Sequence, residues 1–255
     1  MNDPLNESVL RNACCDLTGL RVFFYDCCDS TNTRAKGWLL AGNRGAALFA
    51  AAMQTAGRGR LGRGFYSPAG SGIYLTLTCP MEAPADAFVP VTCAAAVAVL
   101  RAVRARTGRQ TEVKWVNDLY FAGRKVCGIL AEAVTVGEQS AVAVGIGVNL
   151  RPAAFPPELA GIAGSLDDGD TPRAELIAEI ARQLLPFLRQ PERRDWLEDY
   201  RAHSCLIGRQ ITFFRNGEPV PATAVGIDDN GGLTVVTESG AAETLRTGEV
   251  TVRLR

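Results

Sequence analysis

The feature that most restricts the fold is a change of hydrophobic pattern near residue 208. Before it, candidate helices and strands are interspersed. From Gly208 onward the chain has only short segments of alternating apolar and polar residues, separated by hairpin signals at Asn216–Gly217 and in DNGG (229–232). Such alternation is typical of half-buried strands, and Asn-Gly favours tight turns. We therefore predict two domains, 1–207 and 208–255, the second a small five-stranded SH3-like β-barrel.

The first domain has the pattern of an α+β fold with a mixed sheet. The expected strands are 21–26, 46–53, 72–79, 112–115, 125–135 and 140–150. The first expected helix starts near Ser30 or Thr31 and ends at Gly42. A second is expected over 86–107, and two more within 173–203. Residues 151–172 are rich in Pro and Gly and too long for a simple connection, which is typical of a functional loop. An exposed sheet edge, such as 140–148, could pair two subunits as a homodimer.

Charge and cysteine usage exclude several classes of protein. The formal net charge is zero, so no overall field attracts DNA, and the longest apolar run, 91–100, is too short to cross a bilayer. The polar N-terminus is unlike a signal peptide, and the eight cysteines contain no CxxC pair, which favours reduced thiols in the cytoplasm. With His203 as the sole histidine, neither a hydrolase triad nor a His-rich metal cage is expected.

The segment QTAGRGRLGR (54–63) has the composition of an anion-binding loop. Its glycines let backbone amides approach a ligand, and Arg58, Arg60 and Arg63 supply forked donors that suit carboxylates and phosphates. It is neither a Walker A loop nor a GxGxxG turn. Considered alone, it is equally compatible with a flexible basic surface loop or with nonspecific nucleic-acid binding.

The segment KWVNDLYFAGRKVCGIL (114–130) holds two of the three lysines of the chain. Two strands joined by a hairpin would bring Lys114, Asp118 and Lys125 within reach of one another. A carboxylate between two ammonium groups keeps both charged, and an ammonium can neutralise a phosphate oxygen as a compact point charge. Gly128 inside a strand indicates close approach of a ligand. A solvated hairpin with surface lysines is the alternative.

Two further segments are compatible with a ligand site. In VGIGVNL (144–150) a strand with two glycines ends in Asn149, whose amide could pair with the edge of a base. In DSTN (29–32) the hydroxyls could face a polar, uncharged ligand group, although an ordinary helix cap explains the motif as well.

Together, these segments resemble the biotin protein ligases. The matching pieces, in the order of that family, are DSTN (29–32), QTAGRGRLGR (54–63), SPAGSGIYLTL (67–77), KWVNDLYFAGRKVCGILAE (114–132) and VGIGVNL (144–150). Val116 departs from the family's usual KWPND and removes a rigid turn-former but no reactive group. About twenty residues precede the first strand, too few for the helix-turn-helix of bifunctional members, so a ligase without repressor activity is expected.

The resemblance implies a catalytic domain of the class II synthetase-like biotin ligase type. It implies that biotin and ATP form biotinyl-5′-AMP, and that biotin then passes to a lysine of a biotin carboxyl carrier protein. Mg²⁺ would arrive with ATP rather than in a cage of protein ligands alone. The residues expected to catalyse are Lys125, Arg58, Arg60 and Asp118.

The resemblance also assigns binding residues. Those expected to bind biotin are Ser30, Thr31, Asn32, Gln54, Gly57, Arg58, Gly59, Arg60, Lys125, Gly128 and Gly145. Those expected to bind ATP are Arg58, Arg60, Arg63, Lys114, Asn117, Lys125 and Asn149. The alternatives are a lipoate- or octanoate-handling relative with a similar fold, a nonenzymatic nucleic-acid binder, and a regulatory dimer that senses biotin.

Overall fold

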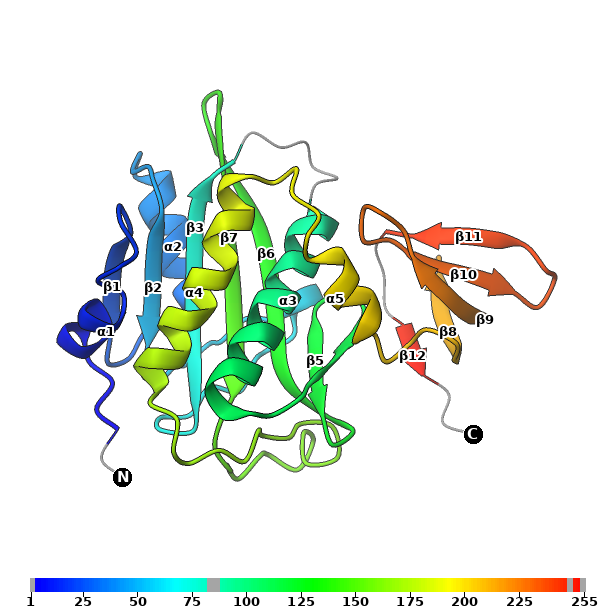
Figure 1. The fold of residues 1–255 in the computed structure, drawn as a ribbon, viewed down its shortest axis with the longest axis horizontal. Coiled ribbons are helices and arrows are strands. Elements are labelled where there is room, and N and C mark those ends of the chain that lie inside the picture. The colour runs from blue at the N-terminus through cyan, green and yellow to red at the C-terminus, as the bar shows by residue number, and fades with distance from the viewer. Residues whose placement is uncertain (1–2, 82–87, 247–249, 253–255) are drawn as a thin grey trace.

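The computed structural model describes residues 3–81, 88–246 and 250–252, which form two sheets with helices around the first (Figure 1). The larger sheet has seven strands in the order β1-β2-β3-β7-β6-β5-β4. Its strands are β1 (Arg21–Tyr25), β2 (Ala47–Ala51), β3 (Gly72–Pro80), β4 (Glu112–Lys114), β5 (Asp118–Phe121), β6 (Arg124–Val136) and β7 (Gln139–Asn149). Strands β1 and β2 run parallel and the other neighbouring pairs run antiparallel, which confirms the predicted mixed sheet.

Helices cover both faces of this sheet. They are α1 (Glu7–Ala13), α2 (Thr31–Leu40), α3 (Phe88–Thr107), α4 (Arg173–Arg189) and α5 (Leu197–Ala202). Helices α3 and α4 lie side by side on one face, and α2 lies on the other (Figure 1). The helices predicted over 86–107 and 173–203 are confirmed, except that residues 86–87 lie outside the described residues. Helix α1 was not predicted.

Helix α3 is long and apolar enough to span a membrane by length and composition alone. In the structure it is instead the core helix of the first domain, because most of it is buried between the sheet and α4. The sheet presents Val144, Ile146 and Val148 of β7 to this core. The alternate residues of β7 therefore face α2, since neighbouring side chains of a strand point to opposite faces.

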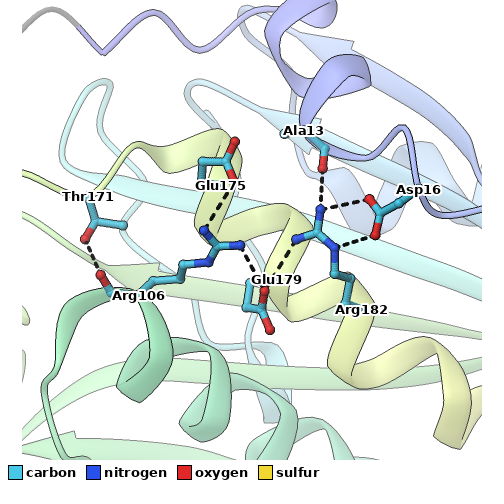
Figure 2. Close-up of polar contacts among 7 residues, drawn as sticks. All are labelled: Ala13, Asp16, Arg106, Thr171, Glu175, Glu179 and Arg182. Atoms are coloured by element: carbon cyan, nitrogen blue, oxygen red, sulfur yellow. Dashed lines mark hydrogen bonds and ion pairs between the residues drawn. The ribbon is translucent and has the colours of Figure 1, made fainter.

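An ionic network joins the helices on the α4 side of the sheet (Figure 2). Arg182 of α4 donates two hydrogen bonds to Asp16, of 2.7 and 2.8 Å, and one of 2.7 Å to the carbonyl of Ala13. Glu179 is shared between Arg182 and Arg106 of α3. The hydrogen bonds from Arg182 lower the pKa of Asp16 to about 2. This network fastens the N-terminal segment and α3 to α4.

The suggested edge at 140–148 is wrong. Strand β7 lies inside the sheet and pairs along its length with β3 on one side and β6 on the other. The sheet edges are β1 and β4, and β4 is itself covered, because Val113 accepts a 3.0 Å hydrogen bond from Cys205 and donates one of 2.8 Å to His203. The apolar character of 140–148 comes from burial, not from an interface.

Helix α2 differs slightly from the prediction. Ser30 is at its N-cap position, but the Ser30 side chain makes no capping hydrogen bond. The helix ends at Leu40, before Gly42, whose φ of +86° places it in the turn that follows.

The second sheet consists of β8 (Gln210–Arg215), β9 (Glu218–Ile227), β10 (Leu233–Thr237), β11 (Ala242–Leu245) and β12 (Val250–Val252). Its order is β11-β10-β9-β8-β12, so the five predicted strands are confirmed as an antiparallel sheet. Within the described residues β11 and β12 are edge strands that do not pair, so the predicted SH3-like barrel is not closed. The chain enters this sheet through Gly208, whose φ is +81°. The division between residues 207 and 208 stays a prediction. The turn between β9 and β10 contacts the first domain, where the indole of Trp115 donates a 2.9 Å hydrogen bond to the carbonyl of Gly231.

All eight cysteines are free thiols. Most are buried small residues of the core, and burial raises the pKa of Cys14 and Cys28 to about 11, so these thiols stay protonated at neutral pH.

Candidate active site

A cleft of about 760 Å³ opens on the α2 side of the sheet, at the ends of β5, β6 and β7. Segments far apart in the sequence line it: the arginine-rich loop, the 114–130 segment and the long loop after β7. Ten of the predicted site residues line this cleft: Arg58, Gly59, Arg60, Arg63, Lys114, Asn117, Asp118, Lys125, Gly128 and Asn149. The tertiary structure therefore brings the predicted cations of both motifs to one cavity.

The two lysines of the 114–130 segment have different surroundings. The ammonium of Lys125 lies 2.6 Å from Asp118 Oδ1, as an ion pair on neighbouring strands. The ammonium of Lys114 lies 5.3 Å from the centre of the Tyr120 ring, in a cation–π contact. Burial, with the nearby charge of Asp118, raises the pKa of Tyr120 to about 12, so its phenol stays neutral. Of these two lysines, Lys125 is the one paired with a carboxylate.

The arginine-rich loop is a short hairpin at the rim of the cleft. Gly59 donates a 2.7 Å hydrogen bond to the carbonyl of Arg63, and Leu61 at its tip is exposed, with φ +55°. The guanidinium of Arg60 donates a 3.0 Å hydrogen bond to Asn117 Oδ1. This bond joins the loop to the 114–130 segment and places Arg60 beside the strand that carries Lys125.

A second polar group lies where α2 begins. Gln54 Oε1 accepts hydrogen bonds from the backbone N–H of Thr31, at 2.8 Å, and from the Thr31 hydroxyl, at 3.2 Å. Gln54 Nε2 donates to the Ser67 hydroxyl at 2.9 Å. Ser30 and Thr31 are buried here, each 3% exposed. Hydroxyl and amide groups fixed in this way can recognise a neutral polar ring.

Asn32, predicted to bind ligand, uses its amide within the protein. Its Nδ2 donates to the carbonyl of Leu130 at 3.3 Å and to Glu132 at 3.0 Å, and its Oδ1 accepts a 2.6 Å bond from Thr76. Asn32 also lies directly over Gly145, where an added Cβ would come within 1.9 Å of Asn32 Oδ1. Gly145 is thus required by Asn32, and both support the site from behind.

Phe65 is a site residue that sequence reasoning missed. Its ring lines the cleft and covers two strand glycines, since a Cβ at Gly147 would lie 2.4 Å from Phe65 and a Cβ at Gly128 would lie 3.2 Å from it. Gly57 is equally constrained, because a Cβ there would lie 2.3 Å from the Phe65 carbonyl. The signal was the aromatic residue that follows the arginine loop, but only the pairing of β6 with β7 shows where its ring lies.

The long loop after β7 forms a wall of the cleft. Lys125 donates its backbone N–H to the carbonyl of Ile162 at 2.9 Å and accepts from Gly164 at 2.8 Å. Asn149, predicted to meet adenine, donates its side-chain amide to the carbonyl of Gly164 at 2.9 Å. Phe155 of this loop packs edge-on against Tyr66, with ring centres 6.2 Å apart. The loop is therefore fastened beside Lys125.

Trp115 connects the cleft to both domains. Its indole reaches Gly231, the peptide bond between Trp115 and Val116 is cis, and the carbonyl of Val116 accepts a 3.1 Å hydrogen bond from Tyr200. The residues on either side of Trp115 and Val116, Lys114 and Asn117, line the cleft. The position of the 114–118 turn thus depends on contacts more than eighty residues away in the sequence.

Comparison with known proteins agrees with this geometry. Residues 24–149 match the model of the biotin/lipoate A/B protein ligase family, and residues 206–253 match that of the biotin protein ligase C-terminal domain. The chain is 35% identical to the biotin--[acetyl-CoA-carboxylase] ligase of Paracoccus denitrificans, over 80% of this chain and 90% of that one. It is 31% identical to the bifunctional ligase/repressor of Bacillus subtilis, over 92% of this chain and 76% of the relative.

Solved structures of biotin protein ligases have a similar fold. The biotin protein ligase of Aquifex aeolicus, in complex with biotin and ATP, aligns with a TM-score of 0.73 and 25% identity, over 91% of this chain and 98% of that one. Sequence, family models and fold agree over both sheets. The chain belongs to the biotin protein ligase family.

Proposed function

We infer that the protein activates biotin with ATP and transfers it to a lysine of a biotin carboxyl carrier protein. In the first step a carboxylate oxygen of biotin bonds to the α-phosphorus of ATP, and pyrophosphate leaves. In the second, the amine of the carrier lysine attacks the acyl carbon, and AMP leaves with the bonding electrons. The observation that carries this inference is the single cleft in which Arg58, Arg60, Lys114 and Lys125 converge.

The cations of the cleft would offset the electrostatic repulsion between the two substrates of the first step. A carboxylate and a triphosphate repel each other, and fixed positive donors offset that repulsion as they approach. Arg58 and Arg60 would hold the biotin carboxylate and the α-phosphate, and Arg63 the outer phosphates. Lys125, held by Asp118 at 2.6 Å, would bridge the carboxylate and the phosphate as charge develops. Lys114 would support the phosphates.

The polar group at the start of α2 suits the neutral end of biotin. Ser30, Thr31 and Gln54 would bind the ureido ring, and the backbone at Gly57 and Gly128 would line its pocket. Asn149 would border adenine, and Asp118 would position the site or take the proton of the incoming amine.

A magnesium ion would accompany ATP. Within the described residues, no group of three or more His, Cys, Asp and Glu side chains is placed to hold a metal. Such an ion would take its ligands mainly from phosphate and water oxygens, as Mg²⁺ prefers. It would supply positive charge on the leaving pyrophosphate.

The cellular setting is also part of the proposal. Balanced charge and eight free thiols support a cytoplasmic enzyme whose partner is a carrier domain rather than DNA or a membrane.

Isotope exchange between pyrophosphate and ATP tests the first step. We expect exchange that depends on biotin and not on lipoate or octanoate, and transfer of biotin to a purified carrier domain. Exchange with lipoate or octanoate in place of biotin would favour the related acyltransferases, and no exchange with any acid would contradict the function. Strong, salt-dependent DNA binding would point to the nucleic-acid alternative.

A further inference from the structure

Glu132 on β6 is a largely buried carboxylate that lies between the two halves of the site. Its Oε1 is 2.8 Å from the ammonium of Lys36 on α2 and 3.5 Å from the guanidinium of Arg58. Its Oε2 accepts a 3.0 Å hydrogen bond from Asn32. The Glu132 side chain is 18% exposed. Its carboxylate contacts two residues of α2, Asn32 and Lys36, and Arg58 of the arginine-rich loop.

These contacts keep Glu132 ionised. Burial by itself raises the pKa of this carboxyl, but hydrogen bonds from Lys36 and Asn32, with the charges of Lys36 and Arg58, outweigh it, so the pKa is lowered. Lys36, the third lysine of the chain, is therefore used as a counter-ion behind the cleft. A buried carboxylate with such partners has a fixed orientation as well as a fixed charge.

The charge of Glu132 fixes the orientation of Asn32. A carboxylate and the backbone carbonyl of Leu130 can only accept hydrogen bonds, so Asn32 has to direct its NH₂ group toward them. The Asn32 carbonyl oxygen then faces the Thr76 hydroxyl, 2.6 Å away. Turning the amide over would set the Asn32 oxygen against the Glu132 carboxylate and the Leu130 carbonyl, neither of which can donate.

The same chain of contacts reaches Thr31. The Thr76 hydroxyl oxygen also lies 2.9 Å from the Thr31 hydroxyl oxygen. Because the one Thr76 proton goes to Asn32 Oδ1, Thr31 donates its own proton either to Thr76 or to Gln54 Oε1, 3.2 Å away. Because its own proton is used within the protein, the Thr31 hydroxyl can offer a ligand only an acceptor lone pair. An acceptor at this place is complementary to a ring N–H, such as that of a cyclic urea.

The contact with Arg58 is of a different kind. At 3.5 Å, and with the Arg58 side chain 46% exposed, it is a weak pair that a substrate anion can replace. Lys36 remains at 2.8 Å when Arg58 leaves, so the carboxylate keeps a counter-ion. Glu132 can thus hold Arg58 at the rim of the cleft and release it at little cost.

We propose that Glu132 is a positioning residue of the ligation reaction. Through Asn32 and Thr76 it fixes the acceptor at Thr31 for the ureido ring, and it holds Arg58 ready for the substrate anions. The proposal rests on the proposed function, because it names how the same site recognises biotin.

The test compares two matched variants. Glu132→Gln keeps the shape but removes the charge, and its amide can donate toward Asn32. Glu179→Gln is the control: Glu179 is 14% exposed and also lies between two cations, Arg106 and Arg182, but on the opposite face of the sheet (Figure 2). The measurements are the dissociation constant for biotin without ATP, the KM for each substrate, and thermal unfolding.

We expect Glu132→Gln to weaken biotin binding about tenfold, as loss of a charge-assisted hydrogen bond does, with a smaller change in the KM for ATP. Glu179→Gln should lose a similar amount of thermal stability and keep its affinity for biotin. Biotin binding within twofold of the wild type in Glu132→Gln, or an equal loss in Glu179→Gln, would overturn the role of Glu132.

A second variant keeps the proposal testable if Glu132→Gln does not fold. Lys36→Gln leaves Arg58 as the remaining cation beside Glu132, which should draw Arg58 back from the cleft and weaken biotin binding about threefold. Unchanged binding would count against the proposal.

A wild-type protein without biotin-dependent exchange would overturn the proposed function as well. Normal exchange in the wild type, with unaffected variants, would overturn the role of Glu132 alone.

Discussion

Substitution of Gly147 by alanine tests whether the Phe65 ring closes the floor of the site. An ideal Cβ at Gly147 would lie 2.4, 2.7 and 2.8 Å from three atoms of that ring. Carbon atoms prefer separations of ~3.5–4.0 Å, so the ring must retreat by about 1 Å or more. Strands β3, β6 and β7 form the floor beneath it, so the ring can move only outward, into the cleft that it lines.

The magnitude follows from the overlap. Overpacking of this kind costs about 1–3 kcal/mol. For a protein of this size, each kcal/mol lowers Tm by roughly 2–4 °C, so scanning calorimetry should detect the loss. Because the displaced ring enters the cleft beside Gly128, the KM for biotin in the exchange assay should rise about tenfold, the equivalent of ~1.4 kcal/mol.

Two variants make this reasoning refutable. Gly226 of β9 is also a strand glycine without positive φ, but an added Cβ there meets nothing within 4 Å, so Gly226→Ala should change neither quantity. Phe65→Leu in the Gly147→Ala background removes the overlapping ring atoms and should recover part of the lost stability, as a coupling in a double-mutant cycle. An unchanged Tm and KM in Gly147→Ala, or no coupling with Phe65→Leu, would show that the ring does not occupy this place.

Three further predictions concern other parts of the molecule. Lys125→Ala should slow single-turnover pyrophosphate release by roughly 10²–10³-fold, with a milder effect of Lys114→Ala; equal effects would contradict the assignment. The folded pKa of Asp16, about 2, lies below its ordinary 3.8, so its stabilising contribution is present above pH 4 and is lost as pH falls toward 2. Asp16→Asn should therefore flatten the acid limb of a Tm–pH profile. Trp115→Phe removes the indole donor to the Gly231 carbonyl, which then keeps only the weak 3.8 Å hydrogen bond from the Cys93 thiol. The substitution should cost about 1–3 kcal/mol in urea unfolding, and unchanged stability would contradict this.

Local patterns were sufficient for most of the fold. Apolar or alternating runs located the strands of both sheets except β5, which the expected strands did not include, and glycine-rich stretches located the loops between them. Helix α1 was missed because its seven residues, ESVLRNA, bury only Leu10 and Ala13 and show no clear apolar stripe. The edge at 140–148 was wrong because a buried central strand and an apolar edge have the same composition, and only pairing partners distinguish them.

The sequence likewise predicted the local features of the site but not its long-range contacts. The motifs 54–63 and 114–130 identified the cations of the cleft because charge and glycine spacing are local properties. They did not indicate that Asn32 uses its amide within the protein, that Phe65 covers Gly147, or that Lys36 serves Glu132. Each of these facts is a contact between residues that lie tens of positions apart.

The sequence alone determined the order of most elements, the different hydrophobic patterns of the two domains, the family resemblance and the residue types available for phosphate chemistry. The tertiary structure decided which of those residues share a cavity and which support it from behind. The physical reason is that periodicity and turn residues report backbone conformation within a few positions. The partner of a buried polar group is set instead by the pairing of β6 with β7 and by the packing of α2 against them.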